Sequence, residues 1–221
     1  MSPSEPSAAV RGRHSEAQRG VRASPLHTAR GPITLSGRIR LPAARLRARL
    51  GRAPERPWIV PAAIGWLRRR IRRNWSVLEL GGGRSTVWFA RRAGRVLAFE
   101  DDPFWVSWAR ERIAARGLDV AEIRELPVER FIGELAQLED ASFDLVVVDF
   151  LESPAADRVE AVRASRSKVR PGGYLLLDDS DRPVYAGAYE LLEGWRERRF
   201  VGVKDGWPEV CETAIFRRPQ K

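Results

Sequence analysis

Short apolar runs alternate with longer stretches of helical periodicity along most of the chain, and this alternation constrains the fold more than any other feature. Seven runs have the length of strands, at residues 76–80, 95–100, 120–124, 143–149, 174–178, 200–204 and 211–216. Helices are predicted before and between them, at 61–73, 85–92, 103–116, 128–138, 155–169 and 183–195. Strands separated by helices of crossover length predict a parallel sheet with helices on both faces.

The last two predicted strands depart from the parallel order. They are joined by Asp205-Gly206-Trp207-Pro208, a turn short enough to make them antiparallel neighbours. We therefore predict an α/β fold with a doubly wound, mostly parallel seven-stranded sheet and an antiparallel C-terminal strand.

Residues 1–57 differ from the remainder in composition, and we predict that they form a disordered, basic N-terminal extension. They are rich in Ser, Pro, Gly, Ala and Arg and contain few large apolar side chains. Of the formal net charge of +10, residues 1–58 carry +9 and the remainder +1. Residues 58–221 are therefore expected to form one nearly neutral domain, whose charge does not favour nucleic acid as a partner.

Several kinds of site and location are excluded or disfavoured by single residue types. Cys211 is the only cysteine, so no intramolecular disulfide can form, and no apolar run approaches the ~20 residues of a membrane-spanning helix. We expect a cytoplasmic protein without a membrane span. The two histidines, His14 and His27, both lie in the predicted extension. Imidazole catalysis and zinc sites of the His or multi-Cys kind are therefore excluded from the domain.

The strongest local signal is the strand at 77–80, which runs directly into three glycines where the next helix begins. In a doubly wound sheet, ligands bind at the carboxyl ends of the strands, and glycines let the backbone approach a ligand closely. Thr86 stands where a dinucleotide-binding loop prefers a third glycine. Glu79, two residues before the first glycine, suits a cationic ligand better than a pyrophosphate.

A second acid follows at the spacing of a ribose contact. The strand at 95–100 ends in Glu100, about twenty residues after the glycines, and we predict that this carboxylate holds ribose hydroxyls. The adjacent Asp101 and Asp102 are expected to cap and begin the next helix.

With these features the sequence resembles the class I S-adenosylmethionine-dependent methyltransferases, especially small bacterial members with the loop Gly-Gly-Gly-Arg-Ser-Thr, here residues 81–86. The resemblance covers Trp75 to Arg217 and includes the segments 143–149, 170–179 and 212–216 in their order. It implies that S-adenosylmethionine is bound by Glu79, Gly81, Gly83, Ser85 and Glu100. The acid-plus-alanine signature that faces the adenine in many members is not evident at 124–128, so no adenine contact is assigned.

Three further acids end predicted strands, Asp149 on the fourth and Asp178 with Asp179 on the fifth. They should gather at the same edge of the sheet as the glycine loop. One interpretation is a Mg²⁺ site formed by all three, a layout similar to that of the catechol-type O-methyltransferases. A second makes Asp149 a catalytic general base without metal. The third is that Asp178 and Asp179 only cap the helix near Pro183.

Aromatic residues could wall the acceptor pocket, although helical spacing favours the core for two of them. The candidates are Tyr185, Tyr189, Trp195 and Trp207, of which Tyr189 and Trp195 are predicted to pack inside.

We expect an enzyme, an S-adenosylmethionine-dependent methyltransferase that acts on a small-molecule acceptor, with O-methylation favoured. An NAD(P)-dependent oxidoreductase would share the strand, the glycines and the distal acid, but it prefers glycine at the position of Thr86. A non-catalytic S-adenosylmethionine-binding module would keep the fold without its chemistry.

Overall fold

The computed structural model describes residues 55–153, 157–205, 207 and 209–220, together with two short strands nearer the N-terminus. These strands, β1 (His27–Thr28) and β2 (Gly31–Pro32), pair antiparallel with each other. The remainder of residues 1–54, and with it most of the predicted extension, lies outside the described residues.

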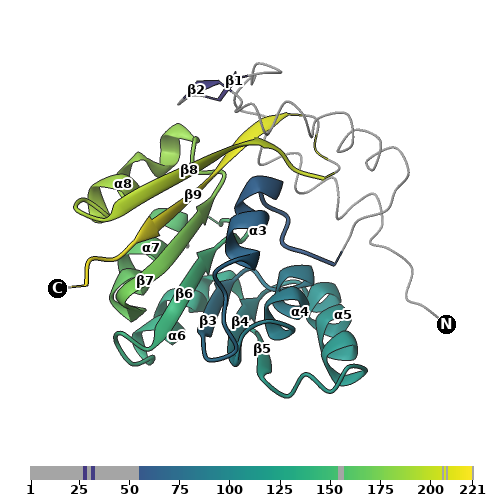
Figure 1. Cartoon of the computed structure of the whole chain (residues 1–221). Helices are drawn as coiled ribbons and strands as arrows, with labels where there is room; N and C mark the ends of the chain where they lie inside the picture. Colours follow the sequence, from purple (N-terminus) through teal and green to yellow (C-terminus); the bar gives the residue numbers. More distant parts are fainter. Residues whose placement is uncertain are drawn as a thin grey trace.

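Seven strands form the main sheet in the order β5-β4-β3-β6-β7-β9-β8 (Figure 1). Neighbouring strands from β5 to β7 are parallel, and β9 runs antiparallel to both β7 and β8. The structure thus confirms the predicted mostly parallel sheet with one reversed strand close to the C-terminus. The strands are β3 (Ser76–Leu80), β4 (Arg95–Glu100), β5 (Ala121–Glu125), β6 (Phe143–Val148), β7 (Val169–Asp178), β8 (Arg196–Val203) and β9 (Val210–Arg217).

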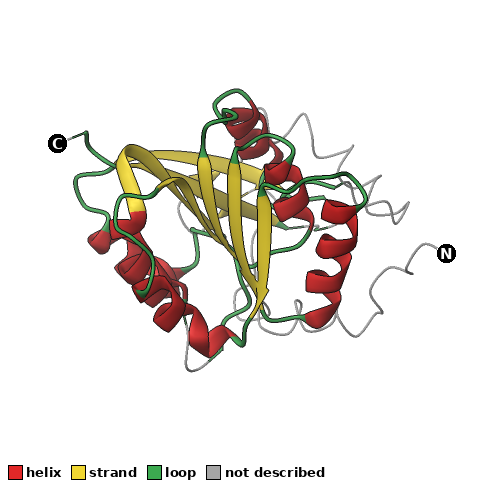
Figure 2. Ribbon diagram, turned by 90° about the horizontal axis from the view of Figure 1, so that it is seen from below, coloured by secondary structure: helices red, strands yellow, loops and turns green. Residues whose placement is uncertain are grey.

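Helices cover both faces of the sheet, which Figure 2 shows from below. One face carries α3 (Pro61–Arg68), α4 (Arg84–Ala90) and α5 (Pro103–Ala114). The other carries α6 (Phe131–Ala136), α7 (Arg158–Ser165) and α8 (Ala186–Leu191), with the 3₁₀ turns η1 (Val128–Arg130), η2 (Arg166–Lys168) and η3 (Pro183–Tyr185) beside them. Because side chains alternate along a strand, β3 sends Val77 to the first face and Leu78 and Leu80 to the second.

The topology sets the position of a ligand site. From β3 the chain builds outward through β4 to β5, and it then crosses back to place β6 on the other side of β3. The direction of winding reverses at β3, and the crevice outside the carboxyl ends of the strands at such a point is where open α/β sheets bind ligands.

Several elements have bounds that differ from those predicted by periodicity, among them α3, α7, α8, β7 and β8. Helix α3 ends at Arg68 rather than at residue 73, because the Ile71 N–H closes a last turn on the Leu67 carbonyl at 2.9 Å and the chain then leaves the helix. Strand β7 begins at Val169 rather than at residue 174. The Pro-Gly-Gly segment that suggested a loop lies inside β7 as an irregularity, and the register against β6 shifts between Phe143 and Leu145.

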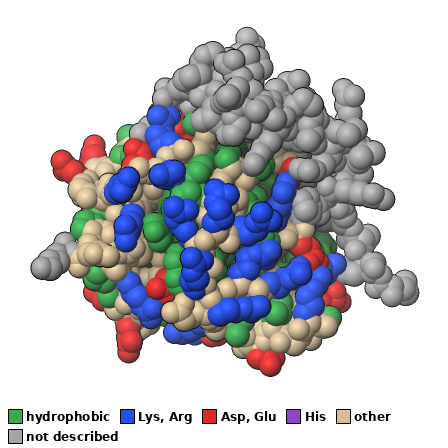
Figure 3. All heavy atoms as spheres, viewed as in Figure 1, with side chains coloured by type: hydrophobic (Ala, Val, Ile, Leu, Met, Phe, Trp, Pro, Cys, Tyr) green, Lys and Arg blue, Asp and Glu red, His purple; other side chains and the backbone are tan. Residues whose placement is uncertain are grey.

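Basic side chains, drawn in one colour for Lys and Arg, gather on the face shown in Figure 3, which is the side from which Figure 1 shows α3. Arg68, Arg69, Arg72 and Arg73 are exposed there, so the nearly neutral net charge expected for residues 58–221 conceals an uneven distribution. In the part of the chain that the structure describes, no helix is both long enough and apolar enough to cross a bilayer.

Candidate functional site

The glycine loop after β3 is pressed against the chain that leaves β6. Gly81 has a φ of +92°, and a Cβ placed on it would lie 1.8 Å from the carbonyl oxygen of Asp149. Gly83 has a φ of +138° and begins α4. Both conformations disfavour any residue with a side chain, so the glycines are required by the local geometry. They bring bare backbone to the carboxyl end of β3.

Glu79 lies directly below this loop and is 1% exposed. Its Oε2 accepts a hydrogen bond from the Thr86 hydroxyl at 2.6 Å, and Thr86 Oγ1 accepts one from the Gly83 N–H at 2.9 Å. Thr86 therefore links the acid to the loop, which explains why no third glycine stands at its position.

The electrostatics of Glu79 favour a cationic neighbour. Burial raises the pKa of Glu79 to about 8, with a further contribution from the Asp149 carboxylate, while hydrogen bonds from Ser85 and Thr86 oppose the shift. Among the described residues, none of the groups that shift this pKa is a cation. A ligand that carries positive charge would supply the missing partner and favour the ionised acid.

Glu100 ends β4, next to the glycine loop, and is 6% exposed. Its Oε1 accepts the N–H groups of Asp101 at 3.1 Å and Asp102 at 2.9 Å, and burial raises its pKa well above the usual range. Asp102 accepts the Phe104 N–H at 2.9 Å, which confirms its predicted role as the cap of α5. The two acids that the sequence singled out thus lie on adjacent strand ends.

Trp105, which the sequence analysis did not single out, lies beside this loop. A Cβ placed on Gly83 would be 3.4 Å from Trp105 Cε3, and the Arg84 guanidinium is 5.2 Å from the centre of a Trp105 ring. Its position in the first turn of α5 gave no periodic signal, because this helix is only weakly amphipathic.

Asp149 follows β6, and its side chain is partly exposed, at 24%. Its Oδ1 lies 3.2 Å from Nη2 of Arg158, a buried guanidinium at the start of α7. Arg158 also donates to the Phe150 carbonyl at 2.7 Å and to the Asp178 carbonyl at 2.9 Å. It therefore joins the ends of β6 and β7. Nothing in the spacing of the sequence indicated this role.

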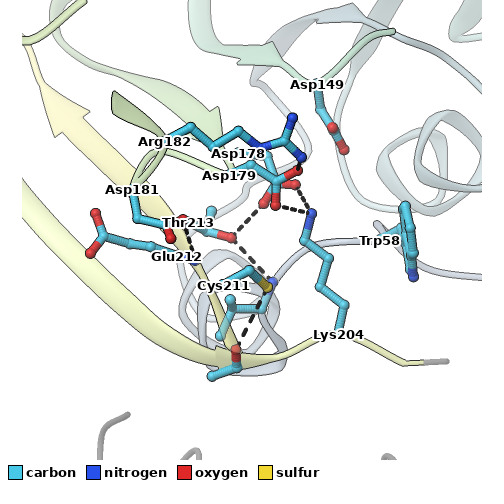
Figure 4. Close-up of polar contacts among 12 residues, drawn as sticks. Trp58, Asp149, Asp178, Asp179, Asp181, Arg182, Lys204, Cys211, Glu212 and Thr213 are labelled. Atoms are coloured by element: carbon cyan, nitrogen blue, oxygen red, sulfur yellow. Dashed lines mark hydrogen bonds and ion pairs between the residues drawn. The ribbon is translucent and has the colours of Figure 1, made fainter. Parts of the chain in front are cut away.

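Asp178 and Asp179 are buried at the end of β7, and Lys204 reaches them from the end of β8 (Figure 4). Lys204 Nζ donates to Asp178 Oδ2 and, at 2.6 Å, to Asp179 Oδ1. Burial raises the pKa of Asp178, whereas for Asp179 the charges of Lys204 and Arg182 outweigh burial and lower the pKa.

The predicted Mg²⁺ site does not fit this arrangement. A lysine ammonium already bridges Asp178 and Asp179, and Asp149 pairs with Arg158 instead of joining them. No group of three or more His, Cys, Asp and Glu side chains within the described ranges is arranged to hold a metal ion. The physical reason is the buried Lys204, which supplies the positive charge that the carboxylates need.

The capping interpretation is also wrong. The N-cap residue of η3 is Arg182, and no side chain caps the backbone N–H groups of this turn. The Asp179 carboxylate accepts from the Arg182 guanidinium instead, and the Asp178 carboxylate accepts from Lys204 and Thr213. Of the aromatic candidates, Tyr189 and Trp195 pack against the core as predicted, and Tyr185 is buried with its hydroxyl on Glu152 at 2.5 Å.

A cavity of 280 Å³ lies elsewhere, at the amino ends of the parallel strands. Trp75, Arg170, Tyr174 and Arg217 help to line it. It is at the opposite edge of the sheet from the glycine loop, so we assign it no part in the candidate site.

Comparison with known proteins finds similarity to methyltransferases. Residues 78–180 match the family model described as a methyltransferase domain. The ribosomal protein L11 methyltransferase of Thermosipho africanus is 28% identical over 141 residues, which cover 61% of this chain and 50% of that protein. The ubiquinone/menaquinone biosynthesis C-methyltransferase UbiE of Idiomarina loihiensis is 28% identical over 129 residues, or 56% of this chain and 49% of that protein. The chain thus spans about half the length of the curated relatives it matches.

Solved structures show the same fold. The O-methyltransferase TomG of Streptomyces achromogenes, solved in complex with S-adenosylmethionine, has a TM-score of 0.55 and 20% identity, with 99% of this chain and 92% of that chain covered. An rRNA methylase of Streptococcus thermophilus has a TM-score of 0.54 and 14% identity, with 71% and 93% covered. The fold is that of the class I methyltransferases. The match over residues 78–180 and the shared fold support a class I S-adenosylmethionine-dependent methyltransferase domain in this chain.

Proposed function

We propose that this chain is an S-adenosylmethionine-dependent methyltransferase whose acceptor is a hydroxyl group of a small molecule. The observation that carries the proposal is the buried Glu79 beneath the glycine loop, a carboxyl group whose pKa is raised to about 8 and is shifted by no cation of the described residues. A sulfonium and an ammonium are the charges that such a group favours. We also propose a cytosolic location, because a lone cysteine gives no indication of an oxidising compartment.

The cofactor side is assigned to five residues. Glu79 would pair with the positive charge of the methionine portion, and the backbone of Gly81 and Gly83 would approach it without steric hindrance. Ser85 supports Glu79 by a hydrogen bond. Glu100 would accept hydrogen bonds from ribose hydroxyls, because its buried carboxyl group lies at the next strand end. When bound, the cofactor supplies a methyl group on a positively charged sulfur.

The acceptor side is assigned to Asp149. Its carboxylate is partly exposed, is oriented by Arg158 and is close enough to Glu79 and Lys204 to shift the pKa of both. It would take the proton of an acceptor hydroxyl as the oxygen attacks the methyl group, a general-base role. The remaining task of the protein is in-line positioning, because a sulfonium is already an activated leaving group. The fold shared with TomG supports oxygen as the acceptor atom.

Calorimetric titration of the full chain with S-adenosylmethionine and, separately, with NAD tests the cofactor assignment. We expect saturable binding of S-adenosylmethionine and weaker binding by Glu100→Ala. Gly133→Ala is the matched control, because a Cβ at that exposed helical position meets nothing within 4 Å. Failure of the folded protein to bind S-adenosylmethionine would refute the proposal, and NAD binding in its place would favour an oxidoreductase. Binding without turnover on a broad set of hydroxylated acceptors would favour a non-catalytic module.

A further inference from the structure

The carboxylates at the end of β7 have a lysine where the sequence suggested a metal ion. Lys204 is 2% exposed, and its ammonium lies between the Asp178 and Asp179 carboxylates (Figure 4). Lys204 is the first residue after β8, a strand that lies beyond the end of the matched family segment 78–180. A buried ammonium is costly unless it is paired, and this one is paired twice.

All four oxygens of the two carboxylates have partners. Asp178 Oδ2 and Asp179 Oδ1 accept from Lys204, Asp178 Oδ1 accepts from the Thr213 hydroxyl at 2.7 Å, and Asp179 Oδ2 accepts from Arg182 at 2.5 Å. A Mg²⁺ or Ca²⁺ ion takes about six or more oxygen ligands and must displace such partners to bind.

The charges of the site balance without a dication. Three carboxylates, those of Asp149, Asp178 and Asp179, are each paired with a cation. The cations are Arg158, Arg182 and Lys204. A divalent ion added to this set would leave an excess of two positive charges in a largely buried volume, and the cost of such an excess is high.

The protein also closes the site over the ammonium. The Trp58 ring lies 5.0 Å from Lys204 Nζ, and Trp58 Nε1 donates to the Asp205 carbonyl at 2.7 Å. The face of an aromatic ring attracts a cation, so the lysine is held from a third side.

We infer that Lys204 is the resident cation of the acceptor side, a positioning residue that holds Asp178 and Asp179 so that methyl transfer needs no divalent metal. The inference rests on the proposed function for its link to methyl transfer, and on the contacts above for the position of the cation. A metal ion in this place would bind two neighbouring acceptor oxygens at once, whereas the Lys204 ammonium is buried and is taken up by the two aspartates. The acceptor class that follows is a molecule with one nucleophilic hydroxyl, without the need for a neighbouring oxygen.

Mn²⁺ binding to the full chain, followed by the electron paramagnetic resonance signal of the free ion, tests the inference directly. We expect no specific site in the wild-type protein up to about 1 mM Mn²⁺. Lys204→Met should open the carboxylate pair and bind Mn²⁺ at least about tenfold more tightly, and the added change Asp179→Asn should abolish that gain.

Lys168→Met is the matched control, because Lys168 is also a buried lysine paired with an aspartate, Asp140, at 2.7 Å. It should gain no Mn²⁺ site. A wild-type site that is lost in Asp179→Asn would overturn the inference, as would a folded Lys204→Met protein that gains none. If Lys204→Met does not fold, Lys204→Gln takes its place, and the wild-type titration decides alone if both fail. S-adenosylmethionine binding measured in EDTA tests the proposed function separately, because it does not depend on how Mn²⁺ behaves.

Discussion

Gly81 shows how strictly a single residue can be required. Its positive φ and the 1.8 Å approach of a placed Cβ to the Asp149 carbonyl leave no room for a side chain, because backbone atoms lie on both sides of the contact. We expect Gly81→Ala to destabilise the fold by roughly 2–5 kcal/mol. Gly133→Ala in α6 should be neutral or stabilising by about 0.5–1 kcal/mol. Urea unfolding of both variants measures this difference in stability. Equal stabilities would mean that the glycine loop moves away from the Asp149 carbonyl.

Glu79 predicts a pH dependence of cofactor binding. With a pKa of about 8 this carboxyl group is protonated below neutral pH, and a cationic ligand must displace that proton to gain its full interaction. The affinity for S-adenosylmethionine should therefore rise with pH between pH 5.5 and 7, by up to about tenfold per pH unit. This range lies below that in which an α-amino group itself titrates.

The control for this pH dependence is Glu79→Gln. In calorimetric titrations the affinity of this variant for S-adenosylmethionine should change less steeply with pH. A part of the slope should remain in that variant, because burial also raises the pKa of Glu100. An identical slope in the wild type and in Glu79→Gln would show that Glu79 does not meet the charge of the ligand.

The sequence could identify those site residues that are marked by a local sequence pattern. Glu79, Gly81 and Glu100 lie at strand ends, where an α/β sheet binds its ligands, and the structure places them near one another. Lys204 and Arg158 have partners 25 and 9 residues away whose choice depends on tertiary packing, so no spacing rule could pair them. The metal prediction failed for this reason, since the carboxylates were visible in the sequence and their cation was not.

At the scale of the element, α7 begins with a residue that connects two strand ends. Arg158 donates to the Asp149 carboxylate and to the Phe150 and Asp178 carbonyls while it is 5% exposed. Replacing it with Met removes the donor of two carbonyls at buried residues and of the partly exposed Asp149 carboxylate, and we expect a loss of stability of about 3–5 kcal/mol. Arg158→Lys should recover only part of this stability, because an ammonium lacks the planar array of N–H donors of a guanidinium.

The comparison for this loss is Arg163→Met on the same helix. Arg163 is 56% exposed and pairs with Glu160 one turn away, so its removal should change stability by no more than about 0.5 kcal/mol. Chemical denaturation gives the free energy of unfolding of the three variants. Similar losses of stability at positions 158 and 163 would contradict the bridging role of Arg158.

Element boundaries were harder to predict than element types. The buried Ile71 continued the helical spacing of α3 although it lies in the turn after the helix. The segment Pro171-Gly172-Gly173 has the composition of a loop, yet it belongs to β7 because pairing with β6 resumes beyond the shift in register. In both cases long-range pairing, which periodicity does not report, decided where the element ends.

For the whole molecule, the family segment 78–180 does not contain the complete site. Its glycine loop, Glu100 and the three aspartates lie within that segment, whereas Lys204 directly follows β8 and Thr213 lies in β9. The segment before α3 closes the same region from the opposite end of the chain, through Trp58. The reversed strand pair is therefore part of the proposed acceptor side as well as an edge of the sheet.

The predicted domain boundary at 57/58 can be tested against these contacts. Arg56 pairs with Asp205, the Val60 N–H donates to Thr213 at 3.1 Å, and Ile59 and Val60 are 2% and 1% exposed. A chain that begins at residue 55 keeps all of these contacts, and one that begins at residue 61 keeps none. Burial of two aliphatic side chains contributes about 3–6 kcal/mol, so we expect the shorter chain to be less stable by that order.

Thermal and urea unfolding of the two truncated chains, with S-adenosylmethionine titrations of each, measure this difference. Because the glycine loop and Glu100 are present in both, a loss confined to stability would mean that the segment 55–60 only completes the fold. A loss of turnover with cofactor binding intact would place Trp58 on the acceptor side, as its contact with Lys204 implies. Equal stability of the two chains would show that the domain begins at α3 and that the contacts of residues 55–60 contribute little.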